Sequence, residues 1–419
     1  MGDEHTLLVA GPGEVTAAPE NRVEAPPLDE AALEAAEESG RHATNLELFL
    51  DLVFVFAVTQ VAGMLASDMS VAGFGRGLLL AWLVWWLWSQ FTWLGTAIDL
   101  GGRSATQFLV LATVPLTLLM AVALPGAYGS SGLEFAGAYL AVNLWALAIQ
   151  GWGLWQEPAS RAAWLRYAPL AALAPMLLLA GAFLPDGARV AVWCVVAVFN
   201  VASAMAGGRG REGKHAWTVD PGHFTERHAL FVIISLGEIL VAVGASAAAV
   251  DLTPAIGAGL LAAVAVACVF WWTYFAFVPD AVERALRRAS PYERGRIARD
   301  RFTFGHFPII FGLVLYAVVA KHVVAHPTDP ASGSDLLVLA GAIAFFVGGL
   351  LGLQWKAMHR LAPERLAAIV ATAVLCGTAG PRVPGVVLVA AVAVIVAIMQ
   401  TITLRRYDRL QAAETRDTP

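Results

Sequence analysis

Long apolar segments and short polar joins alternate along almost the whole chain after residue 43. An α-helix needs about 20 mainly apolar residues to cross the hydrocarbon core of a bilayer, which is about 30 Å thick. Pro and Gly punctuate the joins, as at 124–126 and 185–187. The pattern predicts an all-α, polytopic integral membrane protein with about twelve transmembrane helices, at 46–67, 75–98, 104–125, 134–155, 164–184, 188–205, 224–246, 254–279, 301–324, 333–355, 364–379 and 383–404.

Composition agrees with a protein whose main partner is the lipid bilayer. Hydrophobic residues make up 58% of the chain and charged residues only 14%, whereas soluble proteins carry roughly 25% charged residues. The net charge of -5 comes from acids in the N-terminal tail and gives no reason to expect nucleic-acid binding. No nucleotide-binding motif, metalloprotease motif or nucleophile–base pattern occurs, so we expect no cofactor, no metal and no enzyme activity.

Basic residues lie mostly on one side of the predicted membrane. The joins on the opposite side hold only Arg76, Arg189, Lys321 and Arg382 of the 27 Lys and Arg residues. Because Lys and Arg are enriched in cytoplasmic loops, we expect both termini in the cytoplasm. The Arg-rich stretch 281–301 would then be a cytoplasmic loop that contacts anionic lipid.

The two halves of the chain share an order of features. Glu47 aligns with Glu226, and Asp99 aligns with Asp280 after an aromatic-rich helix in each half. Six helices per half would make the copies enter the membrane in the same direction, as in transporters with parallel repeats. We therefore expect two parallel six-helix repeats. The expected parts are a disordered acidic tail (1–43), the first repeat (44–205), a linker (206–222), the second repeat (223–404) and a C-terminal tail (405–419).

Acidic residues inside the apolar segments are the strongest candidates for a functional site. Glu47 and Asp51 are four residues apart, so they share one face of the first helix. Glu238 lies deep in the seventh segment, with Gln60 at a similar depth in the first half. Since a charged side chain in a membrane helix costs about 2.5–3.5 kcal/mol on insertion scales, we expect these side chains to face protein or water.

Three further polar residues belong to the same candidate site. Glu226 and Arg227 lie at the cytoplasmic entry of the seventh segment and could gate access or pair across the halves. His306 lies inside the ninth segment, where it could relay protons or simply hydrogen-bond between helices. An ordinary interfacial ion pair remains the alternative for Glu226 and Arg227.

Two stretches identify a family resemblance: N-L-E-L-F-L-D-L-V-F-V-F-A-V-T-Q at 45–60 and H-F-T-E-R-H-A-L-F-V-I-I-S-L-G-E at 223–238. They resemble the low temperature requirement protein A (LtrA) family of bacterial membrane proteins. The resemblance implies a multi-pass protein of the bacterial cell (inner) membrane with a link to growth in the cold. It implies no substrate.

The first functional hypothesis is a secondary transporter for a small solute or ion, with Asp51 and Glu238 protonated or ion-bound during the cycle. A cation channel is an alternative, because F-L-D-L-V-F at 49–54 also resembles the first helix of a family of endolysosomal potassium channels. The other alternative is a non-transporting membrane sensor or scaffold in cold adaptation. A homo-oligomer is compatible with each of these functions.

Overall fold

The computed structural model describes residues 42–98, 104–155, 157–207, 219–358 and 362–414. The expected acidic tail therefore lies outside the described residues except for its last two positions. So do 208–218 of the expected linker and the last five residues of the chain.

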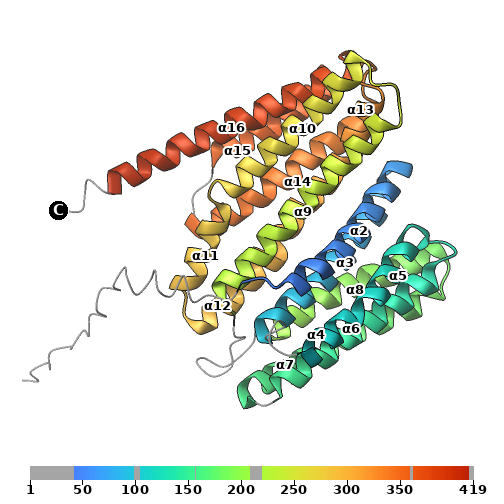
Figure 1. Cartoon of the computed structure of the whole chain (residues 1–419), viewed down its shortest axis with the longest axis vertical. Helices are drawn as coiled ribbons and strands as arrows, with labels where there is room; N and C mark the ends of the chain where they lie inside the picture. Colours follow the sequence, from blue (N-terminus) through green and yellow to red (C-terminus); the bar gives the residue numbers. More distant parts are fainter. Residues whose placement is uncertain (1–41, 99–103, 156, 208–218, 359–361, 415–419) are drawn as a thin grey trace, which may run out of the picture. The chain divides into compact units, whose positions relative to one another are not determined.

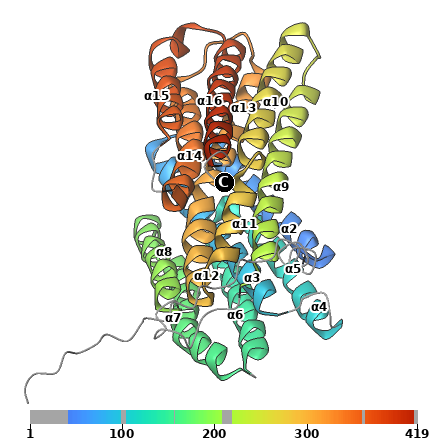
Figure 2. The same ribbon diagram turned by 90° about the vertical axis from the view of Figure 1, so that its left-hand side faces the viewer.

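The described part of the chain consists of helices and their connections, as the apolar pattern predicts. The first half contains α2 (Asn45–Ser67), α3 (Val71–Ala97), α4 (Ser104–Leu111), α5 (Thr113–Ala123), α6 (Gly132–Leu154), α7 (Pro158–Ala182) and α8 (Asp186–Gly207). The second contains α9 (Pro221–Ala248), α10 (Pro254–Phe275), α11 (Val278–Arg288), α12 (Pro291–Ile297), α13 (Phe304–Ala325), α14 (Gly333–Met358), α15 (Pro363–Thr378) and α16 (Gly385–Glu414). Figures 1 and 2 show α9, α10 and α13 to α16 grouped together.

Within the described residues, 11 helices are long and apolar enough to cross a membrane. The third expected span consists of α4 and α5 in succession. The eleventh expected span is α15, whose 16 residues make a helix of roughly 24 Å at 1.5 Å per residue. It is therefore shorter than a typical transmembrane helix.

Polar side chains fix where several helices begin. Thr44 and Glu47 form a capping box at α2, in which the Thr44 hydroxyl accepts from the Glu47 N–H and the Glu47 carboxylate accepts from the Thr44 N–H. Asp220 caps α9 by accepting from the His223 N–H at 3.0 Å. These caps satisfy N–H groups that have no partner within the helix. They also fix the first turns of α2 and α9, the two helices that carry the acidic stretches singled out in the sequence.

Helix α13 lies at the centre of the second half and is buried along nearly its whole length. It packs against α9, α10, α14 and α16, and also against α2 and α3 of the first half. Two glycines allow α13 and α14 to approach closely. A Cβ on Gly312 would lie 2.8 Å from the Ala342 O atom, and one on Gly349 would lie 2.7 Å from Ile309 Cγ1. Small residues at such crossings are typical of packing between membrane helices.

Six kinds of helix pair recur in the two halves. In each half, with α4 and α5 counted as one span, the first helix packs on the second helix and on the third. The third helix packs on the fourth, and the fourth packs on the fifth. The sixth helix packs on the fifth and on the second. The halves meet mainly where α2 and α3 pack on α9 and α13.

The structure corrects one expectation about the segments between the spans and adds a detail about the segment after the last span. The stretch 281–301 is not a loop, because it forms α11, α12 and a π-helical turn, Ala298–Thr303. Helix α16 continues to Glu414, so residues 405–414 of the expected C-terminal tail are helical.

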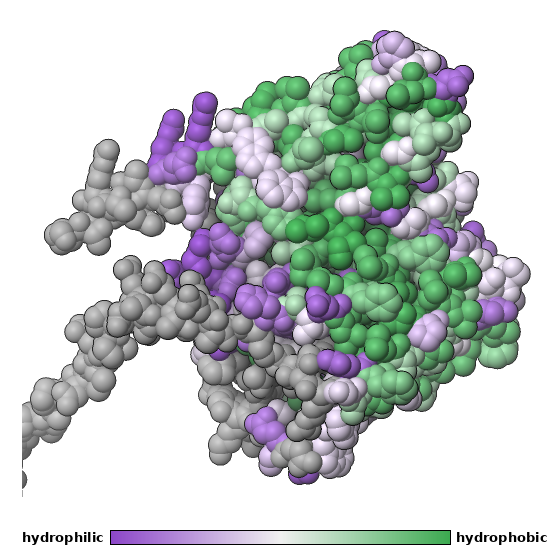
Figure 3. Space-filling model, viewed as in Figure 1, coloured by the Kyte–Doolittle hydropathy of each residue, from purple (hydrophilic) through white to green (hydrophobic). Residues whose placement is uncertain are grey.

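Large apolar side chains cover the outside of the long helices. Val198 of α8, Leu261 of α10 and Val394 of α16 are 67%, 72% and 57% exposed. In Figure 3 the face in view is mostly hydrophobic, and hydrophilic residues gather on the side where Figure 1 places α11, α12 and the end of α16. Such an apolar exterior fits a protein whose long helices are surrounded by lipid.

Candidate functional site

A buried ion pair joins the two halves near the first turns of α2 and α9. The Arg227 guanidinium donates from Nη1 to Asp51 Oδ2 at 2.6 Å and from Nη2 to Asp51 Oδ1 at 2.8 Å. The Trp88 indole of α3 donates to the same Asp51 Oδ1 at 2.8 Å. The Arg227 side chain also lies over the Trp88 ring, 5.8 Å from its centroid. Asp51 is thus bound by side chains from two other helices.

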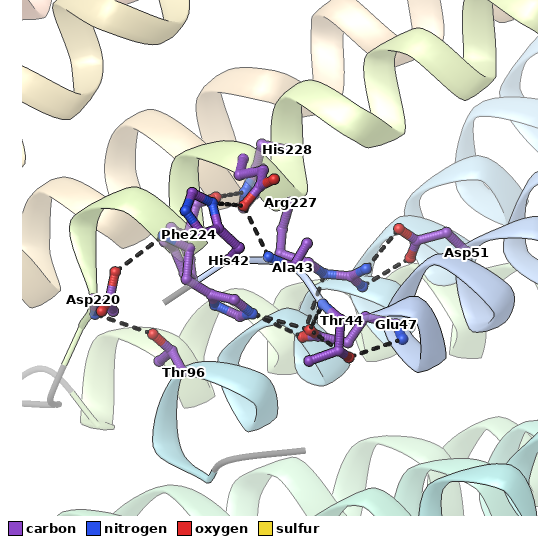
Figure 4. Close-up of polar contacts among 12 residues, drawn as sticks. His42, Ala43, Thr44, Glu47, Asp51, Thr96, Asp220, Phe224, Arg227 and His228 are labelled. Atoms are coloured by element: carbon purple, nitrogen blue, oxygen red, sulfur yellow. Dashed lines mark hydrogen bonds and ion pairs between the residues drawn. The ribbon is translucent and has the colours of Figure 1, made fainter. Parts of the chain in front are cut away.

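A second contact across the halves lies one turn earlier on α2 (Figure 4). His223 Nε2 is 2.9 Å from Glu47 Oε1 and 3.1 Å from Glu47 Oε2. Because a carboxylate accepts, Nε2 is the donor in this contact. Arg227 Nε lies 3.6 Å from Glu47 Oε1, so Arg227 links the two pairs electrostatically. Gly95 of α3 packs directly against the Glu47 carboxylate. A Cβ atom added to Gly95 would overlap with Glu47 Oε1 and lie 3.1 Å from His223 Cε1.

This network consists of four buried ionisable side chains. Glu47, Asp51, His223 and Arg227 are each at most 1% exposed. Two carboxylates and one guanidinium leave one negative charge in excess when His223 is neutral, and uncompensated buried charge is costly. His223 Nδ1 has no hydrogen-bond partner among the described residues.

Glu226 does not belong to this buried network. Its carboxylate accepts from the Ala43 N–H at 2.8 Å and lies 3.3 Å from His42 Nδ1 (Figure 4). Its side chain is 37% exposed. Glu226 therefore holds the segment that leads into α2 against α9, again connecting the two halves.

Glu238 and Gln60 are half-buried and lie apart from Asp51. Gln60 follows Asp51 by nine residues on α2, which is roughly 13 Å along a helix. Thr59 of α2 lies next to the Glu238 carboxyl group, and Lys321 of α13 acts on it electrostatically. The structure thus does not bring Glu238 to the Asp51 site. It gives Glu238 a cationic neighbour from a different helix.

His306 occupies a third polar position, among aromatic rings. Its Nδ1 lies 3.0 Å from Arg301 O, and its Nε2 lies 2.9 Å from the Tyr274 hydroxyl oxygen. Carbonyl oxygens accept, so Nδ1 is the donor and Nε2 accepts from Tyr274. The His306 ring is 5.1 Å from the His228 ring, and His228 Nε2 has no partner within the described residues. These hydrogen bonds link α10 and α13.

A small apolar pocket lies between α2, α3, α9 and α13. It is lined by Val58, Val61, Ala81, Trp85, Phe231, Phe307, Ile310, Phe311 and Val314. Trp85 packs on Trp88 with ring centroids 4.7 Å apart. The pocket therefore lies beside Trp88, a partner of Asp51.

Polar side chains also gather inside the first half, where α3, α6, α7 and α8 converge. The Tyr167 hydroxyl donates to Gln90 Oε1, and Asn200 lies beside the Tyr139 hydroxyl. Several other buried atoms here have no hydrogen-bond partner among the described residues, namely Gln90 Nε2, Asn143 Oδ1 and Gln150 Oε1. Buried polar groups normally have partners, so this cluster has free hydrogen-bonding capacity.

The sequence pointed to both acids and to Arg227, but not to His223 or Trp88. His223 precedes Arg227 by four residues, so both lie on one face of α9, as Glu47 and Asp51 do on α2. That matched spacing is the signal that could have identified His223. Trp88 has no comparable signal, since it lies in a run rich in tryptophan.

The apolar helices and the buried charges between them define a polytopic helical membrane protein. The family model of the bacterial low temperature requirement A protein (LtrA) matches residues 42–401, and the chain therefore belongs to this family. A protein of Rhizobium meliloti (strain 1021), described as "Uncharacterized protein RA0937", is 29% identical over 323 residues, which cover 74% of this chain and 76% of that protein. No solved structure is similar enough to count as a match.

Proposed function

We propose that this protein is a secondary transporter that couples the movement of a small solute to protonation of the network of Glu47, Asp51, His223 and Arg227. One observation carries the proposal: a fully buried network of two acids, one arginine and one histidine spans the two halves. When the halves separate on one side of the membrane, the pairs break and their ionisable groups gain access to water and protons. The state of the network is thereby coupled to the conformation of the protein.

The recurring helix pairs support a mechanism in which the halves move against each other. Alternating access in transporters with repeats is largely a rocking of one repeat against the other around a central site. The same six pairings in both halves are what two parallel copies would produce. On this proposal residues 44–205 and 223–404 are the moving bodies, in the bacterial inner membrane with both termini in the cytoplasm.

The apolar pocket favours a carrier over a cation channel. Large aromatic and aliphatic side chains line it on α2, α3, α9 and α13 next to Trp88, and such a lining offers no polar groups to a cation. The free hydrogen-bonding groups inside the first half, such as Asn143 and Gln150, provide contacts for an uncharged polar part of a solute. No catalytic role is proposed for these residues.

Proteoliposomes that contain a pH-sensitive dye test the proposal. A panel of amino acids, sugars, polyamines and inorganic cations is added outside, and solute-dependent proton movement is recorded. We expect at least one solute to move protons with the unaltered protein and none to do so with Asp51→Asn. The exposed Asp251 between α9 and α10 provides the matched control, Asp251→Asn, which should keep the full signal.

Two results would contradict the transporter. One is proton movement in Asp51→Asn equal to that of the unaltered protein. The other is a complete lack of solute-dependent proton movement together with unitary currents in planar bilayers, which would instead indicate a channel.

A further inference from the structure

A second fully buried arginine, Arg365, lacks the acidic partner that Arg227 has. Arg365 lies in the first turn of α15 and is 1% exposed. Its Nη1 donates to Leu350 O of α14 at 2.7 Å, and its guanidinium lies over the Phe277 ring, 5.4 Å from the centroid. These contacts fix the guanidinium plane, but Arg365 forms no salt bridge with an acid among the described residues, and Glu364 acts on it only electrostatically.

The two atoms that remain free belong to one edge of the guanidinium. Arg365 Nε and Nη2 have no hydrogen-bond partner within the described residues. Their N–H bonds point the same way, and this edge is one of the two that bind an oxyanion through a pair of parallel hydrogen bonds. Arg227, by contrast, binds Asp51 through Nη1 and Nη2.

The neighbouring charges do not complete the pair. Glu364 is the adjacent acid, but its Oε2 accepts from Arg406 of α16 at 3.2 Å. Its other oxygen, Oε1, is buried without a partner in the described part of the chain. Two arginines and one glutamate leave one positive charge in excess at this place. The start of α15 adds to this charge, because a helix N-terminus carries partial positive charge.

We propose that the Nε–Nη2 edge of Arg365 binds a phosphate group, supplied by an anionic phospholipid headgroup or by a free phosphate in solution. The site lies at the start of α15, which we place on the cytoplasmic side, and α14 contributes the Leu350 carbonyl that orients the guanidinium. Tyr407 of α16 stacks on Phe277, so α16 supports the ring over which the guanidinium lies. Glu364 competes with the phosphate for the same cations.

Binding is measured on the full-length protein in detergent, with inorganic phosphate as one probe and phosphatidylglycerol as the other. We expect each phosphate-bearing probe that binds to raise the unfolding temperature, since a ligand stabilises the state to which it binds. Arg365→Lys keeps the charge but loses the planar edge, and we expect it to weaken binding at least tenfold. Glu364→Gln removes the competing carboxylate and should strengthen binding several-fold.

A matched control comes from the corresponding helix of the first half. Arg161 lies in the first turn of α7 over the Trp155 ring, at 5.6 Å, but is exposed. Arg161→Lys should leave binding unchanged. Native mass spectrometry of the protein with phosphatidylglycerol or phosphatidylcholine separates the two sources: retention of phosphatidylglycerol identifies a lipid site, and a response to inorganic phosphate alone identifies a solute site.

The proposal is overturned if neither phosphate nor phosphatidylglycerol binds, or if Arg365→Lys binds either probe as tightly as the unaltered protein. A loss of stability in Glu364→Gln without any gain in binding would also overturn it, because Glu364 would then itself be the partner of Arg365. All of these results are independent of proton-coupled transport, because none of the variants touches the Asp51 network.

Discussion

Replacing Asp51 by Asn should destabilise the protein far more than removing the whole ion pair. The asparagine side chain would retain one acceptor oxygen for Arg227 or Trp88, while its NH₂ group would face donors. Arg227 is 0% exposed, and its remaining carboxylate contact is Glu47 Oε1, 3.6 Å from Nε. Breaking one partner of a buried ion pair costs about 3–5 kcal/mol, so we expect Asp51→Asn to lose about that much stability.

The double variant Asp51→Leu with Arg227→Met removes both charges and keeps apolar side chains of similar length. Replacing a buried pair in this way is often neutral or stabilising, by about 1–4 kcal/mol. Trp88 Nε1 then loses its acceptor, which costs about 1–3 kcal/mol. We therefore expect the free energy of unfolding of the double variant to lie within about 2 kcal/mol of that of the unaltered protein, and we expect the variant to transport nothing.

Equilibrium unfolding in one detergent, followed by tryptophan fluorescence, compares the three proteins, and proton movement in proteoliposomes compares their function. The reasoning is refuted if Asp51→Asn loses less than about 1 kcal/mol, well below the cost of a broken buried pair, because Arg227 would then not depend on Asp51. A double variant that unfolds normally and still transports would show that the pair is only structural.

Other substitutions test single contacts. Trp88→Phe removes the donor to Asp51 and should cost about 1.5–3 kcal/mol, the range for hydrogen bonds to charged groups; an unchanged unfolding midpoint would contradict the contact. Gly95→Ala places a methyl group against Glu47 and should abolish proton movement with little loss of helix content by circular dichroism; normal movement would exclude close packing there. Gly312→Val pushes α13 and α14 apart and should cost about 1–3 kcal/mol of overpacking, seen as a lower unfolding temperature, while an unchanged temperature would count against the crossing.

The acids of the candidate site and Arg227 could be singled out from the sequence, but which side chains pair with one another could not. Glu47 and Asp51 stand out because carboxylates are rare in apolar helices. Whether such an acid pairs with a cation or lies free depends on a neighbouring helix. Arg227 of α9 pairs with Asp51, and Lys321 of α13 acts electrostatically on Glu238. Since α2 and α9 are separated by more than 150 residues of sequence, no local pattern could show that they meet.

Arg365 is a basic residue whose burial could not be predicted from the sequence. By the apolar pattern it is the second residue of the expected span 364–379, at the membrane boundary. The structure buries it between α14, α15 and the Phe277 ring. Its burial follows from the packing of neighbouring helices, which hydropathy along the chain does not encode.

The sequence by itself determined that the chain is a bundle of membrane helices. In lipid every backbone N–H and C=O must be satisfied within the protein, and an apolar segment of about 20 residues does this as a helix. Only the tertiary structure decided which faces of these helices meet, because lipid and protein are equally apolar and the choice depends on small residues and buried polar pairs. In this protein, the close contacts at Gly312 and Gly95 and the Asp51–Arg227 pair help to determine which helix faces meet.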